Sequence, residues 1–87
     1  MNKAWYVYIL ECADQTLYCG ITTNLTRRLS EHNQTSRGSK YVRPRRPARL
    51  VYFETVASRS EAQSREFQIK RLKRNQKLEL IRKVELE

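Results

Sequence analysis

The sequence predicts an α+β domain, in which a small three-stranded antiparallel sheet is flanked by helices in the order β-β-α-β-α-α. Three short segments rich in β-branched and aromatic residues predict the strands. Helical segments follow the second and third strands, each behind a residue that can cap a helix. The chain has 87 residues, of which 39% are hydrophobic, so we expect residues 1–87 to form one small domain with a modest core.

The first two strands, residues 5–12 and 17–23, are expected to form a hairpin around a polar turn. Tyr8 and Tyr18 share a face of this hairpin only if the numbers of paired residues sum to an even value. A two-residue turn gives an odd sum. We therefore predict a three-residue loop at residues 14–16, or a bulge with the same effect.

A helix is expected to begin after Thr23 or Asn24, either of which can cap it, and to end near Asn33. At 100° per residue one face of this helix carries an arginine and a histidine beside two leucines, namely Leu25, Arg28, Leu29 and His32. Arg28 and His32 are one turn apart, so their side chains can meet. They are either edge residues of a packed stripe or chemical groups that face the tyrosine hairpin.

The second half of the chain begins with a loop-like segment, residues 34–49, followed by a strand at residues 50–54. Ser58 and Glu61 fit a capping box for a helix that reaches about Lys73. A last amphipathic segment carries Leu78, Ile81 and Val84.

Glu66 lies on the apolar side of the helix after the third strand, among residues such as Ala62 and Ile69. Burying an unpaired carboxylate is costly, so a partner is expected. That partner is either a base such as Arg28, in a structural ion pair, or a divalent metal. Magnesium takes only one or two carboxylates and keeps several waters, so one glutamate is enough.

The charge of the chain favours a polyanionic partner. Eighteen Lys and Arg against nine Asp and Glu give a net charge of +9, which points to nucleic acid ahead of simple solubility. Six residues of the proline-containing loop are expected to follow a phosphate backbone in extended conformation: Arg37, Lys40, Tyr41, Arg43, Arg45 and Arg46. The basic run at residues 70–74 either adds to this contact or complements a helix dipole.

Two cysteines, Cys12 and Cys19, fall on neighbouring predicted strands. They form either a cross-strand disulfide or a reduced, partly buried pair, and we favour the reduced pair. The sequence shows neither a membrane-spanning apolar run nor a signal peptide, so we expect a cytoplasmic protein without membrane contact.

The order of these motifs resembles the GIY-YIG nuclease superfamily over nearly the whole chain. Tyr6-Val7-Tyr8 stands where the first strand motif of that family belongs, and Tyr18-Cys19-Gly20 where the second belongs. Arg28 and His32 match the arginine and histidine of its first helix, and Glu66 matches its metal-binding glutamate. The short stand-alone bacterial members are the most similar. The first motif has Tyr6 in place of glycine, the second has Cys19 in place of a branched aliphatic residue, and the late asparagine of the family has only Asn75 as a candidate, which is equally a helix cap.

The resemblance implies an endonuclease that hydrolyses phosphodiester bonds with Mg²⁺ or Mn²⁺. Tyr8 would be the base or would orient the attacking water, and Tyr18 would bind a phosphate oxygen or that water. Arg28 would hold the phosphate, His32 would relay a proton or orient Tyr8, and Glu66 would bind the metal.

The substrate implied is DNA rather than RNA, read with low sequence specificity, with a possible role in repair or recombination. Relatives usually carry extra domains for target choice, so a protein partner is one expectation. The alternative is a nucleic-acid-binding module on the same scaffold with weak or no cleavage.

Overall fold

A computed structural model describes the backbone of residues 4–85 and the side chains of residues 4–83. It confirms the α+β fold and the β-β-α-β-α-α order, with a short 3-10 helix added in the loop after the first helix. The elements are β1 (Trp5–Glu11), β2 (Leu17–Thr22), α1 (Leu25–Gln34), the 3-10 helix η1 (Arg43–Arg45), β3 (Arg49–Val56), α2 (Arg59–Lys70) and α3 (Arg74–Glu85).

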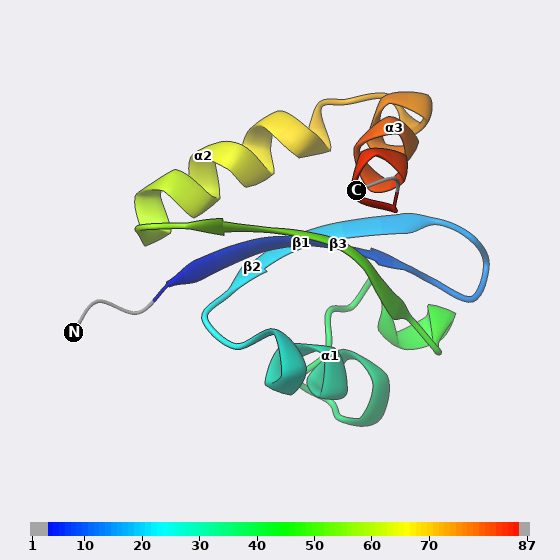
Figure 1. Cartoon of the computed structure of the whole chain (residues 1–87). Helices are drawn as coiled ribbons and strands as arrows, with labels where there is room; N and C mark the ends of the chain where they lie inside the picture. Colours follow the sequence, from blue (N-terminus) through cyan, green and yellow to red (C-terminus); the bar gives the residue numbers. More distant parts are fainter. Residues whose placement is uncertain (1–3, 86–87) are drawn as a thin grey trace.

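The sheet has the strand order β2-β1-β3, and both pairs are antiparallel. Helix α1 and the following loop cover one face, while α2 and α3 cover the other (Figure 1). We call these the α1 face and the α2–α3 face. Because side chains alternate along a strand, β1 sends Tyr8 and Leu10 to the α1 face and Val7 and Ile9 to the opposite one.

The hairpin has the even register that the tyrosines require. Tyr8 pairs with Gly20 and Leu10 pairs with Tyr18, so Tyr8 and Tyr18 lie on the same face. The loop is three residues long but comes one residue earlier than predicted: the N–H of Cys12 donates to the carbonyl of Thr16 (2.8 Å), which leaves residues 13–15 as the loop. Gln15 adopts a φ of 69°, typical of the last residue of a three-residue hairpin loop.

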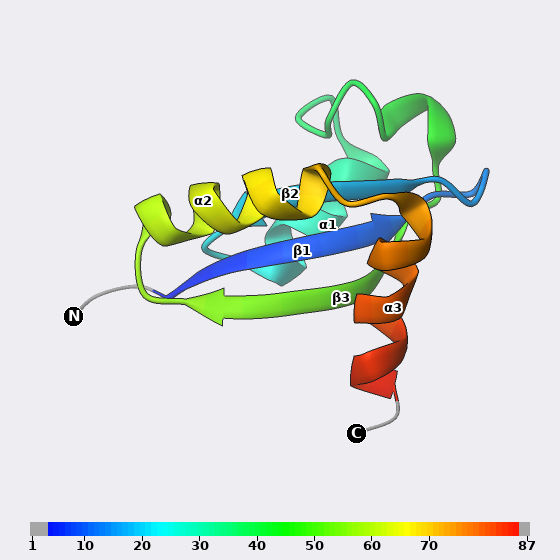
Figure 2. The ribbon, with the colours of Figure 1, turned by 90° about the horizontal axis from the view of Figure 1, so that it is seen from above.

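The α2–α3 face contains the aliphatic core. Helix α2 runs along the strands and α3 crosses one end of the sheet, so that the two helices cover it together (Figure 2). The buried residues of this core are Val7, Ile9, Cys19, Tyr52, Ala62, Ile69 and Ile81. Cys12 belongs to the other core, and both cysteines are free and buried, so a disulfide between them is excluded.

The helix starts follow the predicted capping chemistry. Asn24, not Thr23, caps α1, because its Oδ1 accepts the N–H of Arg27 at 3.0 Å. Ser58 caps α2 by accepting the N–H of Glu61 at 3.1 Å. The Glu61 carboxylate accepts the N–H of Ala57 at 2.9 Å.

The end of α2 differs from the prediction. The helix ends at Lys70 rather than near Lys73, and α3 begins at Arg74. Asn75 therefore lies inside the first turn of α3 and does not cap it; the side chain of Gln76 accepts the N–H of Lys73 instead (2.9 Å). The Val84 side chain lies outside the described residues. Within residues 4–85 no helix is long and apolar enough to cross a membrane.

Candidate functional site

Three of the predicted site residues meet on the α1 face. The hydroxyl of Tyr8 lies 2.9 Å from Nε2 of His32. The Tyr18 ring contacts both, with centroids 6.5 Å from Tyr8 and 5.3 Å from His32. Tyr41 of the loop lies nearly parallel to Tyr18, at 6.1 Å and 19°. The strands supply the two tyrosines and α1 supplies the imidazole, so the helical stripe faces the hairpin as predicted.

Hydrogen bonding fixes the tautomer of His32. The backbone N–H of Ser39 donates to Nδ1 of the imidazole at 3.1 Å, so Nδ1 carries no proton. His32 is fully buried, and burial, followed by the charge of Arg28, lowers its pKa to about 4. The neutral ring therefore carries its proton on Nε2 and donates it to the Tyr8 oxygen. In this state His32 orients Tyr8 and cannot receive its proton at Nε2.

Tyr8 is a neutral phenol in this arrangement. It is 2% exposed, and burial, with a smaller contribution from Tyr18, raises its pKa well above the ordinary value of a tyrosine. The Arg28 guanidinium acts in the opposite direction. Because the Tyr8 oxygen accepts from His32, its own proton is directed elsewhere. The group is therefore oriented to donate to a ligand, and a further cation would be needed to ionise it near neutral pH.

Gly20 makes room for the tyrosine opposite it. A Cβ at this position would lie 2.5 Å from the Tyr8 hydroxyl and 2.7 Å from its Cζ, both far inside van der Waals contact. This clash explains why a glycine stands in the second strand motif: any side chain here would push the Tyr8 hydroxyl away from His32.

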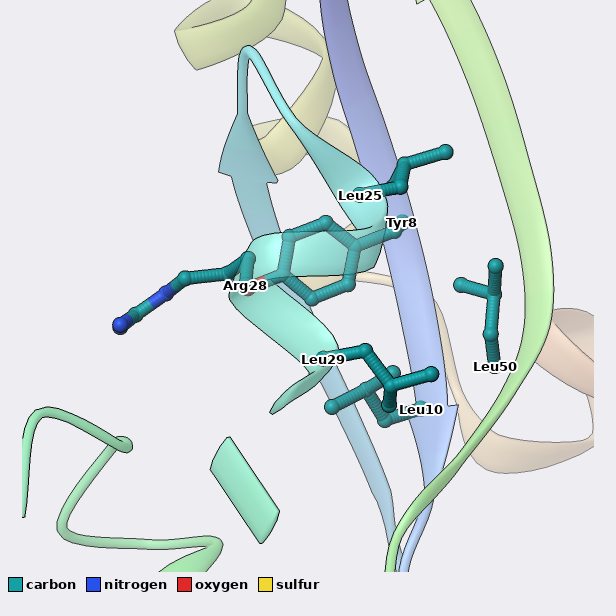
Figure 3. Close-up of a pocket in the computed structure, with 6 residues that line it drawn as sticks. All are labelled: Tyr8, Leu10, Leu25, Arg28, Leu29 and Leu50. Carbon is teal, nitrogen blue, oxygen red and sulfur yellow. The ribbon is translucent and has the colours of Figure 1, made fainter. Parts of the chain in front are cut away.

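Arg28 closes the site on its α1 side. Together with Tyr8, Leu10, Leu25, Leu29 and Leu50 it lines a narrow crevice, and its guanidinium points out of that crevice (Figure 3). The guanidinium donates to the Glu31 carboxylate (3.0 Å) and to the carbonyl of Arg37 (2.8 Å). This cation is partly exposed at the rim beside Tyr8, where an anion can reach it.

The loop after α1 is built differently from the extended segment that we predicted. The short 3-10 helix folds it back onto α1. The Arg46 guanidinium donates to the carbonyls of Glu31, His32 and Thr35 at the end of α1, so it is a structural cap rather than a free phosphate contact.

Other loop side chains are also engaged in the fold. Arg45 pairs with Asp14 (3.0 Å) and lies 3.9 Å above the Tyr41 ring, while Arg43 bonds the carbonyl of Ser36 at 3.4 Å. Gly38 touches the backbone of α1 so closely that a Cβ would lie 2.8 Å from the Glu31 carbonyl oxygen. Among the described residues, the side chains of Arg37 and Lys40 make no hydrogen bond or ion pair and remain available to a phosphate.

Glu66 is not brought into the tyrosine cluster. It belongs to α2, on the other side of the sheet, next to β2. Burial raises the pKa of the Cys19 thiol to about 12, and the nearby Glu66 carboxylate adds to that rise. Glu66 forms the structural ion pair that was one of its two expected partnerships, but with Lys70 one turn along α2 (3.3 Å) rather than with Arg28. In the basic run that follows, Arg71 lies 5.4 Å from the centre of the exposed Phe67 ring.

No group of three or more His, Cys, Asp or Glu side chains in the described part of the chain is arranged to hold a metal ion. A magnesium site with one carboxylate, completed by waters and substrate phosphate, does not require such a group. Glu66 fits that single role, because its side chain is 23% exposed and its partner Lys70 is a half-exposed cation in a weak surface pair that a metal ion could replace.

Sequence reasoning missed three contributors to the site. Ser39 acts through its backbone N–H, which no residue pattern reveals. Gly38 and Arg46 hold the loop against α1, and both stood in a segment interpreted as a nucleic-acid contact. Of these three residues, only Gly38 could have been noticed in the sequence. It is one of only two glycines in the chain, and a glycine can mark a close approach of backbone to backbone.

The chain is similar to several known proteins. A family model described as the GIY-YIG catalytic domain matches residues 4–79. A UPF0213 protein of Desulfotalea psychrophila is 54% identical over 81 residues, covering 93% of this chain and 74% of its own. A UPF0213 protein of Clostridium perfringens is 57% identical over 76 residues, which cover 87% of this chain and 81% of that protein.

Two solution NMR structures are similar as well. A protein from E. faecalis is 41% identical with a TM-score of 0.66, over 100% of this chain and 94% of that one. A UPF0213 protein from Bacillus halodurans is 42% identical with a TM-score of 0.57, over 90% of this chain and 82% of that one.

Proposed function

The chain belongs to the family of GIY-YIG catalytic domains, a nuclease family, and from that premise we propose that it is a divalent-metal-dependent DNA endonuclease of low sequence specificity. One observation carries the proposal: a buried tyrosine hydroxyl is held by a histidine N–H, with a second tyrosine and an arginine at its rim. A core with only a structural role would not be expected to gather these polar groups, because burying each of them costs free energy unless it is hydrogen-bonded.

Tyr8 is proposed to act on the attacking water. His32 donates to the Tyr8 oxygen, so it stabilises the phenolate once Tyr8 loses its proton, and Arg28 adds to that stabilisation. In the phenolate form Tyr8 accepts a proton from water; in the neutral form it orients water or a phosphate oxygen by donation. Tyr18, beside it, is the second hydroxyl that can bind the phosphate.

Arg28 is proposed to bind the phosphate that is cleaved. A guanidinium binds two phosphate oxygens at once, and it stabilises the negative charge that grows in the pentacovalent state. In the free protein Glu31 holds the same guanidinium, and the hydrogen bond from Arg28 lowers the pKa of the Glu31 carboxyl. An incoming phosphate would compete with Glu31 for Arg28.

The metal is Mg²⁺ or Mn²⁺, with Glu66 as its protein ligand. When bound, such an ion would supply a Lewis acid and positive charge to a phosphate of the substrate. Because Glu66 lies across the sheet from Tyr8, the substrate would have to reach around the edge strand β2 to contact both. To hold this ion, Glu66 would have to release Lys70. Arg37 and Lys40 contribute the non-specific backbone contacts, which predicts an affinity that falls steeply with salt. A role in repair or recombination follows only if branched or damaged DNA is the preferred substrate.

The proposal is tested by cleavage of branched, nicked and single-stranded DNA by the wild type, Tyr8→Phe and Glu66→Gln, with Mg²⁺, with Mn²⁺ and with chelator. We expect Tyr8→Phe to lose about 10³-fold in rate, within the range for a lost acid–base group. Tyr52→Phe is the matched control, since Tyr52 is buried on the other face of the sheet. Cleavage that persists in Tyr8→Phe, or in chelator, would reject this site.

A second candidate function is a DNA-binding module that does not cleave. The observation in its favour is that both charged site residues are already paired, Arg28 with Glu31 and Glu66 with Lys70. Salt-sensitive DNA binding by the wild type, without cleavage in either metal, would select this function.

A further inference from the structure

An open groove lies beside the tyrosine cluster on the same face of the sheet. It measures about 400 Å³ and is lined by Tyr6, Thr23, Asn24, Leu25, Thr26 and Phe53, which we call the aromatic groove. That volume is in the range that accepts a drug-sized ligand, and a nucleotide is of that size. No acidic side chain lines the groove, and the first turn of α1 carries none.

The aromatic groove offers a flat apolar surface to a ligand. Phe53 is 49% exposed, although it stands on a strand of the sheet directly opposite Tyr8. Its ring meets the Tyr6 ring edge to face, with centroids 6.1 Å apart and planes at 72°, which favours this orientation of both rings. An exposed aromatic ring is a surface on which a base can stack.

The rim of the groove is polar rather than apolar. Thr23 and Thr26 each carry a hydroxyl, and Asn24 uses its Oδ1 to cap α1. Its amide Nδ2 makes no hydrogen bond within the described residues, so it can donate to a ligand. Donors and acceptors around a flat apolar floor match the edge and the face of a nucleobase better than they match an apolar protein segment.

The groove is continuous with the proposed cleavage site. Leu25 lines both the aromatic groove and the crevice of Tyr8 and Arg28 (Figure 3). Tyr6 precedes Tyr8 by two residues on β1, which places their Cα atoms about 7 Å apart. A stacked strand rises roughly 3.4 Å per nucleotide, so the groove is one or two nucleotides from a phosphate at Tyr8.

We propose that the aromatic groove binds an unpaired nucleobase one or two nucleotides from the phosphate at Arg28. This inference rests on the proposed function and narrows its substrate: a base that stacks on Phe53 cannot be paired within a duplex, so the substrate is single-stranded, nicked or branched at that point. The net charge of +9 supports a polyanionic ligand over other ligands with a flat ring.

The test measures binding without cleavage, by fluorescence anisotropy of a labelled single-stranded oligonucleotide in chelator at low salt. We expect Phe53→Ala and Phe53→Leu to weaken binding about tenfold, and Phe53→Tyr, which keeps the ring, to bind like the wild type. Phe67→Ala is the matched control, because Phe67 is 62% exposed on α2, across the sheet. An oligonucleotide of abasic nucleotides should bind the wild type and Phe53→Ala equally.

Three results would overturn the inference: unchanged binding by Phe53→Ala, an equal loss on the abasic oligonucleotide, or an equal loss in Phe67→Ala. If Phe53→Ala bound the oligonucleotide like the wild type but lost binding to a protein partner, the groove would be a protein contact instead. The cleavage assay separates the two proposals. Cleavage that is insensitive to Phe53 refutes the groove alone, whereas base-dependent binding without cleavage refutes the nuclease alone.

Discussion

The two faces of the sheet differ in the groups that they bury. The α2–α3 face buries mostly aliphatic side chains such as Ile9, Ile69 and Ile81, together with the phenol of Tyr52, whereas the α1 face buries a phenol in direct contact with an imidazole. Both faces are well packed, and every buried side-chain polar atom in the described residues has a hydrogen-bond partner. The α2–α3 face therefore provides most of the stability through apolar burial, with Glu66 as its one proposed functional group. The α1 face holds the other chemical groups, which remain compatible with folding only through specific bonds.

The largest effect is expected from a cavity in the aliphatic face. Ile69 is fully buried, so Ile69→Ala should lower the free energy of unfolding by roughly 4 kcal/mol. Urea denaturation measures this loss. If the two faces have separate roles, DNA cleavage per folded molecule stays within about twofold of the wild type, and a large loss of cleavage in the folded fraction would break the comparison.

A smaller effect is expected from pH, and it belongs to the α1 face. The pKa of His32 is about 4 in the folded chain and about 6.5 when unfolded. Between these values the unfolded state binds more protons, so stability is complete above pH 6.5 and is lost as the pH falls toward 4. From pH 7.5 to 5 the free energy of unfolding should fall by about 2 kcal/mol. His32 should account for most of this loss, because the pKa values of the Asp14, Glu31 and Glu54 carboxyls are lowered, so they gain protons at a lower pH.

The measurement for His32 is urea denaturation at pH 5, 6 and 7.5. His32→Gln removes the titrating group and keeps a polar side chain, so its stability should vary less over this range. Equal pH dependence of the wild type and His32→Gln would show that the imidazole does not carry the effect.

The next effect concerns the space beside Tyr8. Gly20→Ala should lower the cleavage rate about tenfold, because its Cβ takes the place of the Tyr8 hydroxyl. The backbone φ of Gly20 is one that any residue adopts, so the effect is steric. In a double-mutant cycle with Tyr8→Phe, the second substitution should cost little further activity. Fully additive losses would contradict direct contact between the two positions.

The smallest effect distinguishes two cations of the loop. Lys40→Ala should reduce DNA affinity only a few fold and lower the salt slope of binding by about 1, with stability unchanged. Arg46→Ala should instead lower stability by about 1 kcal/mol, because it removes hydrogen bonds at the end of α1. Fluorescence anisotropy at several salt concentrations measures the DNA affinity, and urea denaturation measures the stability. If Arg46→Ala lowered DNA affinity and left stability unchanged, the predicted phosphate role of Arg46 would be restored.

The sequence predicted the elements well, because their signals are local. Apolar alternation indicated the strands, and capping residues such as Asn24 and Ser58 indicated the helix starts. The even register of the hairpin followed from requiring Tyr8 and Tyr18 on one face, although the loop was placed one residue late. The end of α2 was misplaced because residues 70–74 continue the helical pattern while the backbone turns.

The site could be predicted only in part. Residue spacing places Arg28 and His32 on one face of α1, but the contact of His32 with Tyr8 also requires that this face packs on the hairpin. The use of Arg46 as a helix cap depends on how the loop folds back, which a charge pattern does not encode. The distance of Glu66 from the tyrosines likewise depends on which face α2 covers, and that is a matter of chain topology.

The bond from Ser39 to His32 has an evolutionary consequence. A backbone amide is present in every residue except proline, so a substitution at position 39 keeps the donor to the imidazole, although it removes the Ser39 hydroxyl that accepts the N–H of Tyr41 at 3.1 Å. Selection would then act on the number of residues between the two positions rather than on their identity. A relative with the same spacing would keep this bond, whereas a single insertion or deletion between the two positions would remove it without touching any of the family motifs.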